Sequence, residues 1–580
     1  MGEVRLHTSS AGLNPAFLEV GRDLVLHLDP AHGTDAPQGT YVFDFLDAQA
    51  RHAADRAALD AVHRWRALVS EALTVDGVDW SFVWVLPLYQ VANPAISRAL
   101  ALRQALSELD EPPLVLADSD PHTARLAAAV REDLGVRWRV ATGARPPTLP
   151  ARRIPPVALA RRLRRAALRV ATGLGAPSVV RRGSAAVHPY WPLMPVLDRM
   201  LADRRRAPAL FLDKRPAGLG RSIRMAMRGG WIGLPTVTDR HRARAAAGRM
   251  AAALRREQPL SVGDLELGPL LHPQLVASAL QRAPGDVAES AMLRRAFRSG
   301  RPRWVLGSWD IEPRARLVVL LAQEAGVRTL SLCHGAYLLP QPLADLDLCD
   351  EVALWCHETA PPITNWDRPI HVVGYPLPYH HPPPTRSRVP GRSRIVVLGQ
   401  VGVPSTCVLD ERITMRSYDT ALKAIFARFP DASVCLRPHP SQDREAFPVL
   451  RSRFPDRDLR EETAMDIIDL LRGVDLCIAG ASTATLQGAL TGTSVIALNL
   501  SGSEWPFPLG GDSAVPVARS AEELDSSLEE WQRRAALPGR EDLLKGLGAD
   551  GSDGAARVLS VLDGGAQPSD VGGAQEETDR

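Results

Sequence analysis

The sequence predicts an α/β fold built from parallel sheets in two halves, and three observations support this. Short apolar runs alternate with longer helical patterns along most of the chain. The runs are apolar without interruption, which is typical of strands buried on both faces of a parallel sheet. A proline-rich segment, residues 374–394, separates two series of such runs. Alternating strands and helices on both sides of a stiff connector indicate two α/β halves.

The first half, predicted as a domain over residues 1–375, contains six candidate strands. They are Trp80–Leu86, Pro113–Ala117, Val136–Ala141, Ala209–Leu212, Arg303–Gly307 and Thr329–Cys333. Helical patterns over Pro121–Leu134 and Pro313–Ala325 follow two of these runs. This order is expected of helices that connect parallel strands.

The second half, predicted over residues 394–563, repeats the alternation after a hinge at 376–393. Its candidate strands are Ile395–Leu398, Ser433–Leu436, Asp475–Ala479 and Ser494–Leu498. The tail from 564 to 580 is polar and rich in glycine, so we expect it to be disordered.

Composition excludes several classes of protein. A chain of 580 residues with 45% apolar residues needs more than one core. The formal net charge of +3 gives no reason to expect a nucleic-acid partner. The beginning of the chain lacks a secretory signal, and no apolar run is long enough to span a bilayer. Six cysteines without CxxC spacing indicate free thiols in a reducing compartment, so the predicted location is cytoplasmic.

The segment 151–197 has an unusual charge. It contains nine arginines and neither aspartate nor glutamate. Within it, Leu159, Leu163, Ala166 and Val170 fall on one helical face. A basic amphipathic helix of this kind binds anionic membrane surfaces, so residues 151–182 are a candidate for peripheral contact with the inner face of the plasma membrane. A solvated connecting helix is the alternative.

Three strand ends in the second half supply polar groups to one edge of the predicted sheet. In open parallel sheets, ligands bind beyond the carboxyl ends of the strands. The first predicted strand is followed by Gly399-Gln400 and the second by Arg437-Pro438-His439-Pro440, and the third is followed by Gly480–Thr485. The sequence therefore predicts a ligand site at this edge.

The turn Gly480–Thr485 has the features of an anion site. A turn of small residues leading into a helix presents free N–H groups at the positive end of the helix dipole. Ser482 and Thr483 are suited to cap that helix and to donate to a phosphate oxygen. The histidine of the preceding strand end, His439, lies between two prolines and is therefore a positioned donor. Capping alone, and a rigid surface loop, are the simpler alternatives.

These motifs resemble those of the GT-B glycosyltransferases, and in particular bacterial enzymes of capsule, lipopolysaccharide and other surface-polysaccharide synthesis. His439-Pro440 and Ser482-Thr483 match the HP and serine motifs of bacterial sialyl- and polysialyltransferases. The resemblance implies two Rossmann-like domains that face each other across a cleft. It also implies transfer, without metal or cofactor, from a CMP-, UDP- or GDP-linked sugar to a glycan or lipid-linked acceptor. The acidic-acidic-glycine motif of the polysialyl type has no clear match here.

The first half is expected to supply the acceptor site and the catalytic base. Asp310 and His334 follow two successive strands, where a carboxylate or an imidazole can accept the proton of an acceptor hydroxyl. Capping of the next helix is the alternative for Asp310. The sequence Asp118-Ser-Asp120 and the paired histidines in 380–384 lie in a turn and in the hinge, so we do not predict a metal site.

The complete prediction for the site has two parts. The predicted catalytic residues are His439, His334 and Asp310, and the predicted binding residues are Gly399, Gln400, Arg437, Gly480, Ser482, Thr483 and Thr485. Three other functions are open. The CDP-glycerol glycerophosphotransferases also pair an HG histidine with an RPHP histidine, but Gly480–Gln487 lacks their aspartate and Phe-Asp. A nucleotide-sugar epimerase and a non-catalytic nucleotide-sugar-binding protein are the others.

Overall fold

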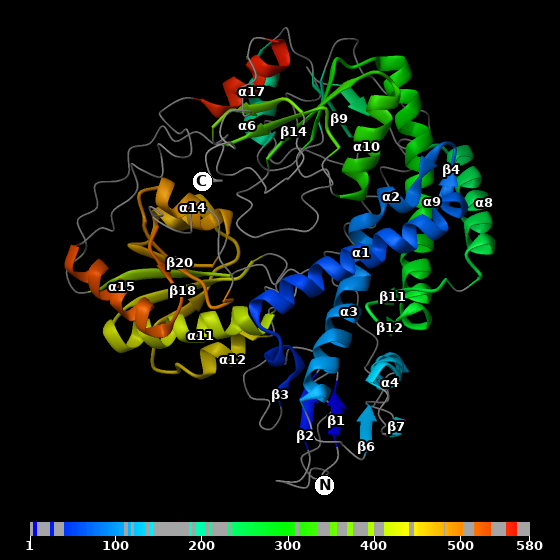
Figure 1. Cartoon of the computed structure of the whole chain (residues 1–580). Helices are drawn as coiled ribbons and strands as arrows, with labels where there is room; N and C mark the ends of the chain where they lie inside the picture. Colours follow the sequence, from blue (N-terminus) through cyan, green and yellow to red (C-terminus); the bar gives the residue numbers. More distant parts are fainter. Residues whose placement is uncertain are drawn as a thin grey trace, which may run out of the picture.

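The protein was analysed as a computed structural model of the whole chain (Figure 1). It describes residues 4–7, 24–27, 40–108, 114–117, 121–134, 139–142, 185–187, 193–203, 208–211, 230–232, 235–256, 258–307, 312–333, 348–355, 368–374, 392–399, 411–439, 446–480, 482–502, 515–534 and 553–564.

The second half forms a six-stranded parallel sheet. Its strands are β17 (Arg394–Leu398), β18 (Ser433–Arg437), β19 (Leu459–Glu461), β20 (Leu476–Ala479), β21 (Ser494–Leu498) and β22 (Val517–Ala518). They lie in the order β19-β18-β17-β20-β21-β22, and every pair is parallel. Numbered along the chain this is 3-2-1-4-5-6, the strand order of the Rossmann fold.

Helices cover both faces of this sheet (Figure 1). On one face lie α11 (Glu411–Arg428), α12 (Ala446–Ser452) and α15 (Ala521–Arg534), whose apolar side chains pack with those of alternate strand residues. On the other face lie α13 (Ile467–Arg472) and α14 (Thr483–Leu490). The continuous apolar runs in the sequence thus reflect strands that are buried on both faces.

A second parallel sheet has seven strands and comes from the first half. Its strands are β8 (Ala185–Val187), β9 (Ala209–Phe211), β10 (Gly230–Ile232), β13 (Trp304–Gly307), β14 (Arg328–Leu332), β15 (Glu351–Leu354) and β16 (Ile370–Val372). Their order, β10-β9-β8-β13-β14-β15-β16, follows the same 3-2-1-4-5-6 plan with one added edge strand. The predicted fold class, α/β with two Rossmann-like sheets, is confirmed.

The structure adds a third parallel sheet that the sequence analysis did not predict. Its strands are β1 (Val4–His7), β2 (Leu24–His27), β3 (Thr40–Tyr41), β6 (Leu114–Ala117) and β7 (Arg139–Thr142), in the order β3-β2-β1-β6-β7. The helix α4 (Pro121–Leu134), as predicted, connects its last two strands. Two of the six predicted first-half strands, β6 and β7, therefore belong to this separate sheet.

Both first-half sheets make the crossover from their third to their fourth strand in the same way. A long helix leads into a two-stranded hairpin, and a second long helix leads out of it. The first set is α1 (Ala48–Leu73), β4 (Thr74–Val75), β5 (Val78–Asp79), α2 (Trp80–Val83) and α3 (Val85–Ser107), preceded by the short 3-10 helix η3 (Val42–Phe45). The second set is α8 (Val237–Ala253), β11 (Ser261–Val262), β12 (Leu265–Glu266) and α9 (Gly268–Gly300). These helices pack together into one layer.

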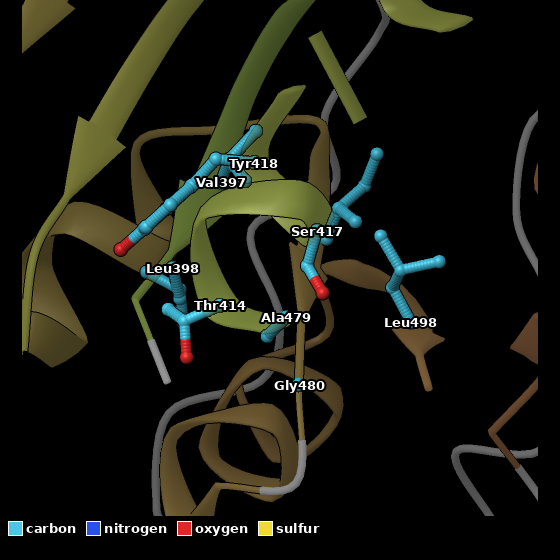
Figure 2. Close-up of a pocket in the computed structure, with 9 residues that line it drawn as sticks. Val397, Leu398, Thr414, Ser417, Tyr418, Ala479, Gly480 and Leu498 are labelled. Carbon is cyan, nitrogen blue, oxygen red and sulfur yellow. The ribbon is translucent and has the colours of Figure 1, made fainter. Parts of the chain in front are cut away.

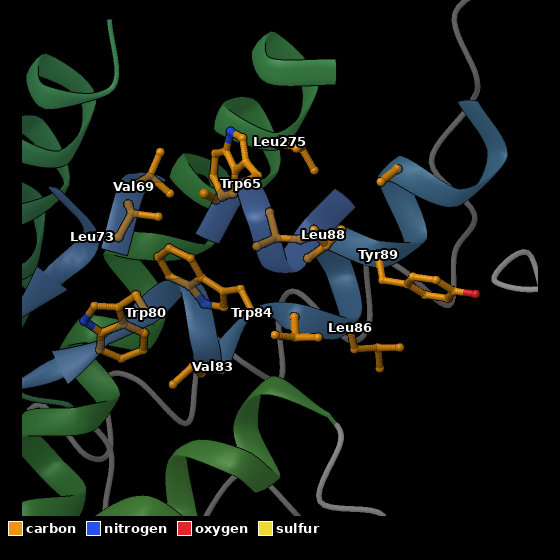
Figure 3. Close-up of a cluster of buried hydrophobic side chains, with 14 of the residues drawn as sticks. Trp65, Val69, Leu73, Trp80, Val83, Trp84, Leu86, Leu88, Tyr89 and Leu275 are labelled. Carbon is orange, nitrogen blue, oxygen red and sulfur yellow. The ribbon is translucent and has the colours of Figure 1, made fainter. Parts of the chain in front are cut away.

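The predicted strand Trp80–Leu86 is wrong, because this run lies in the helical layer. Asp79 accepts hydrogen bonds from the backbone N–H groups of Ser81 and Phe82 at 2.9 and 3.4 Å, which starts a helix directly after the hairpin. Trp80 and Trp84 are fully buried near Trp65 of α1 (Figure 3). An apolar run that is buried on all sides does not distinguish a strand from a helix.

The last described helix, α17 (Gly554–Asp563), packs on α6 (Met194–Ala202) and joins the core of the seven-stranded sheet (Figure 1). The indole Nε1 of Trp304 in β13 donates to the backbone oxygen of Leu562 at 2.9 Å. The predicted domain 394–563 includes this helix, so the contact crosses the predicted boundary. The boundaries, the hinge at 376–393 and the tail stay predictions. Residues 376–391 of the hinge, the basic segment 151–182 and the tail from 565 lie outside the described residues.

Candidate functional site

The candidate site lies at the carboxyl edge of the six-stranded sheet. Leu398 of β17 lies level with Arg437 of β18 on one side and with Ala479 of β20 on the other. The helix that follows β17, α11, covers one face of the sheet, and the helix that follows β20, α14, covers the opposite face. The strand order therefore reverses at β17, and this topological switch point is where ligands bind in open parallel sheets.

Backbone contacts keep this edge compact. The N–H of Gly399 donates to the carbonyl of Arg437 at 2.6 Å, which holds the end of β17 against β18. Gly399 and Gly480 are both buried. Small residues at the two central strand ends leave the backbone without side-chain cover, as close approach of a ligand requires.

The amino terminus of α14 is built by two hydroxyls. The Ser482 side chain accepts from the N–H of Ala484 at 3.2 Å and caps the helix. Thr485 Oγ1 donates to the carbonyl of Gly480 at 2.7 Å, and this side chain is fully buried. Thr485 therefore holds the backbone of the turn through its buried hydroxyl. Ser482 and Thr483 are half-buried.

A glycine seats α14 against the sheet. A Cβ atom on Gly488 would lie 2.9 Å from Cγ2 of Val495 and 3.7 Å from Cβ of Cys477. Real Cβ atoms essentially never make so short a contact. Glycine at this position lets the helix, and with it the Gly480–Thr485 turn, approach the strands closely.

His439 lies two residues beyond β18 and is half-buried. Burial lowers the pKa of its imidazole below the ordinary value of 6.5. The ring is therefore neutral at neutral pH and donates one N–H. Arg437 of the same motif is half-buried, and its Nη1 donates to the carbonyl of Glu462 at 3.2 Å.

A narrow crevice lies behind the switch point, between α11 and the strand ends (Figure 2). Its volume is about 10 Å³, roughly the space of one water molecule. Thr414 and Ser417 of α11 line it opposite Ala479 and Gly480. The crevice is too small for a ligand, so a ligand at this edge lies outside it.

The sequence analysis missed a larger hollow at the ends of β21 and β22. It has a volume of about 420 Å³ and is lined by Arg416, Thr420, Asn499, Leu500, Gly502, Arg519 and Ala521. This volume falls in the range of small-molecule sites. The available sequence signal was Asn499, which directly follows the predicted strand Ser494–Leu498.

The structure brings part of the predicted site together. Gly399, Arg437, His439, Gly480, Ser482, Thr483 and Thr485 all lie at one sheet edge, at the ends of three adjacent strands. Gln400, Asp310 and His334 lie outside the described residues, as do Asp118-Ser-Asp120 and the paired histidines in 380–384. Among the described residues no cluster of three His, Cys, Asp or Glu side chains has the arrangement of a metal site.

The cysteines near the site are unreactive. Cys435 in β18 is buried, and burial raises the pKa of its thiol to about 11. Burial also raises the pKa of the Cys477 thiol in β20. Cys333, Cys349, Cys435 and Cys477 are buried and free, which fits the predicted free thiols, and neither thiol beside the site is a nucleophile near neutral pH.

No protein family matches the sequence, and no curated protein matches it either. The chain is similar to solved structures of GT-B architecture. Acinetobacter baumannii MurG is 12% identical over 66% of this chain and 99% of its own, with a TM-score of 0.36. The S. aureus MnaA-UDP co-structure is 10% identical over 67% and 99%, with a TM-score of 0.40. The calicheamicin glycosyltransferase CalG4 is 12% identical over 66% and 98%, with a TM-score of 0.37. The fold class rests on the strand orders of this chain, not on these likenesses.

Proposed function

We propose that the protein is a glycosyltransferase that moves a sugar from a nucleotide-sugar donor to a surface polysaccharide or glycolipid acceptor. One observation supports this most. The switch point of a Rossmann-type sheet brings together a close-approach glycine turn, a half-buried imidazole and a capped helix amino terminus. Each of these is suited to the phosphates of a nucleotide sugar.

In the proposed reaction, the bond between the sugar carbon and the donor phosphate oxygen breaks, and its electron pair stays with the phosphate. The acceptor hydroxyl oxygen forms the new bond to that carbon, and its proton passes to a base. Negative charge grows on the departing phosphate. The N–H of His439 and the hydroxyls of Ser482 and Thr483 at the amino terminus of α14 are the donors that stabilise it. Because the imidazole is neutral, His439 acts by hydrogen bonding and not by charge.

The base and the acceptor site are assigned on sequence grounds. His334 is the preferred base, because it stands at a glycine turn after β14, and Asp310 is the second candidate. The base contacts the acceptor and not the donor. His334→Ala and Asp310→Asn should therefore separate loss of transfer from retained nucleotide affinity. The variant that loses transfer while keeping affinity identifies the base.

The first experiment is a thermal-shift panel with CMP, UDP, GDP and CDP. A nucleotide that binds only the folded chain raises its Tm by mass action. Transfer is then assayed with the matching sugar donor, with and without EDTA, and the donor is also tested for epimerisation and for glycerophosphate transfer from CDP-glycerol. We expect transfer that survives EDTA, because hydrogen-bond donors replace the metal. Loss of transfer in EDTA with recovery in Mn²⁺ would contradict the proposal of metal independence.

Three further assignments belong to this proposal. The CMP-, UDP- and GDP-linked donors are all candidates. The role in capsule or lipopolysaccharide synthesis rests on the motif resemblance. Cytoplasmic location and membrane contact through residues 151–182 are also proposed on sequence grounds. No described helix has both the length and the apolar composition to cross a membrane.

A further inference from the structure

The outer face of α8 is strongly basic. Residues 237–256, which comprise α8 and the three residues after it, contain six arginines and one aspartate. Their formal charge is +5, whereas the whole chain has +3. The five exposed arginines of this face are Arg242, Arg244, Arg249, Arg255 and Arg256, and His241 is exposed beside them. We call these six residues the α8 basic face.

The single acidic residue of this stretch does not offset the exposed charge. Asp239 is 5% exposed and completes the capping box at the start of α8 with Thr236. It is also paired with Arg295 of α9, whose guanidinium nitrogens lie 2.8 and 2.6 Å from its two oxygens. The arginine beside it, Arg240, donates to the carbonyl of Pro235.

The exposed guanidiniums of the α8 basic face have no carboxylate partner within the described part of the chain. Arg242, Arg249 and Arg256 follow one another at intervals of seven residues, with alanines at 245 and 252 between them. Arg242 and Arg249 lie on α8, where this spacing puts them on one side of the helix, and Arg256 follows in the bend beyond the helix end at Ala253. The small alanine side chains leave space for a partner beside the arginines of the helix.

The shape and composition of this face favour one class of partner. In Figure 1, α8 lies on the outside of the helical layer, on the side of the molecule away from the six-stranded sheet. Neither of the two hollows described above includes a residue of α8. The face has no aromatic side chain, whereas binding of single-stranded nucleic acid depends on stacking platforms. The exposed large apolar residue of α8 is Val237, which is 61% exposed and lies at the start of the helix, outside this face.

We propose that the α8 basic face docks the protein on an anionic lipid surface. An exposed group of arginines with little apolar area suits the negative potential of a membrane leaflet, and each arginine near the surface adds to the binding. This surface differs from residues 151–182 and does not depend on the proposed transfer reaction. Binding to lipid is measured without nucleotide, so its failure and the failure of the proposed function are separate results.

The test is sedimentation of the full chain with two kinds of vesicle. One is pure phosphatidylcholine, and the other contains about one quarter phosphatidylglycerol. We expect binding to the anionic vesicles that is lost as salt is raised, and no binding to the neutral ones. The triple variant Arg242→Gln, Arg249→Gln, Arg256→Gln should bind on the order of 100-fold more weakly. Glutamine keeps the helix propensity of arginine, and an unchanged Tm confirms the fold.

The matched control removes the same charge elsewhere. Arg125→Gln, Arg451→Gln and Arg533→Gln replace exposed arginines of α4, α12 and α15. This control should bind within a few-fold of wild type. The variant with lysine in place of Arg242, Arg249 and Arg256 should do the same, because a surface potential does not need a planar guanidinium. Equal losses in the control or in the lysine version would overturn the proposal. Equal binding to neutral vesicles would also overturn it, as would α8-dependent binding to duplex DNA without binding to vesicles.

Discussion

The carboxyl edge of the six-stranded sheet and the α8 basic face are both suited to negative groups, but by different means. At the sheet edge the donors are a neutral imidazole, backbone N–H groups and capping hydroxyls, and Arg437 is half-buried with a backbone partner. On α8 the groups are exposed guanidiniums without a carboxylate partner in the described residues. Directed hydrogen bonds in a partly buried site select the geometry of a ligand, whereas exposed charges respond mainly to its potential.

This comparison predicts opposite responses to salt and to substitution. Ligand binding at the sheet edge should change little with ionic strength, because its donors are neutral. Binding through α8 should weaken steeply, because exposed charges are screened.

Replacement of His439 by alanine should reduce transfer on the order of 100- to 1,000-fold, because one positioned hydrogen-bond donor to the departing phosphate is lost. The fold should persist, since the ring is half-buried in a loop. Steady-state kinetics and thermal melting measure both effects. His241→Ala on α8 is the matched control and should leave transfer unchanged. Transfer by His439→Ala within a few-fold of wild type would remove His439 from the mechanism.

The double variant Ser482→Ala, Thr483→Ala should weaken nucleotide affinity about 10- to 100-fold, since the loss of even one charge-assisted hydrogen bond costs about 1.5–3 kcal/mol. Loss of the cap itself costs only about 1 kcal/mol of stability. Isothermal titration and urea unfolding separate the two effects.

The matched control for this double variant is Ser520→Ala. Ser520 accepts from the N–H of Glu523 at the start of α15. We expect the control to lose a similar amount of stability and no nucleotide affinity. If the double variant behaves like the control, Ser482 and Thr483 only cap the helix.

Two glycine-to-alanine replacements should act with opposite signs. At Gly488 the new methyl group meets Val495 at 2.9 Å, so we expect a loss of about 1–3 kcal/mol in the free energy of unfolding. At Gly248 on α8 a Cβ atom has no neighbour within 4 Å, so we expect a gain of about 0.5–1 kcal/mol. Urea unfolding of the two variants measures both. If Gly488→Ala leaves the free energy of unfolding unchanged, α14 moves away from the sheet without loss of stability.

The pH dependence should separate the two surfaces further. Because the pKa of folded His439 lies below 6.5, the unfolded chain binds more protons between these two values. The contribution of His439 to stability is therefore complete above about pH 6.5 and is lost as the pH falls toward the lowered pKa. His439→Ala should lack this dependence in urea unfolding. Vesicle binding by the His241→Ala variant, whose α8 basic face holds only arginines, should not change between about pH 5.5 and 8. A transfer rate that falls as the pH is raised through about 6.5 would contradict a neutral imidazole, because it would require the protonated ring.

Much of the fold could be predicted from the sequence, because strands buried on both faces are continuous apolar runs. The runs at 395–398, 433–436, 475–479 and 494–498 all became strands of one sheet. The five-stranded sheet was missed because its first two strands are only four residues long and lack helical patterns between them. The run Trp80–Leu86 was misassigned because its helical structure depends on the Asp79 cap and on the packing around it, which an apolar run does not reveal.

The candidate site could be predicted in part. The strand ends identified Gly399, His439 and Ser482, because the carboxyl ends of parallel strands meet at one edge. The neutral state of His439 was not predictable, since its pKa depends on burial by residues distant in sequence. The buried position of Thr485 was also not predictable from spacing. The α8 basic face was overlooked because arginines in sequence do not reveal which of them find a carboxylate in space.

The packing of α17 has a consequence for the synthesis of the chain. The seven-stranded sheet takes its strands from residues 185–372, yet part of its apolar cover, including the contact between Trp304 and Leu562, comes from residues 554–563. While the intervening residues are being translated, the side chains that α17 will cover stay in contact with water. Apolar surface exposed on a nascent chain is a site for aggregation and for chaperone binding. Translation past residue 563 is therefore required before the apolar cover of this sheet is complete.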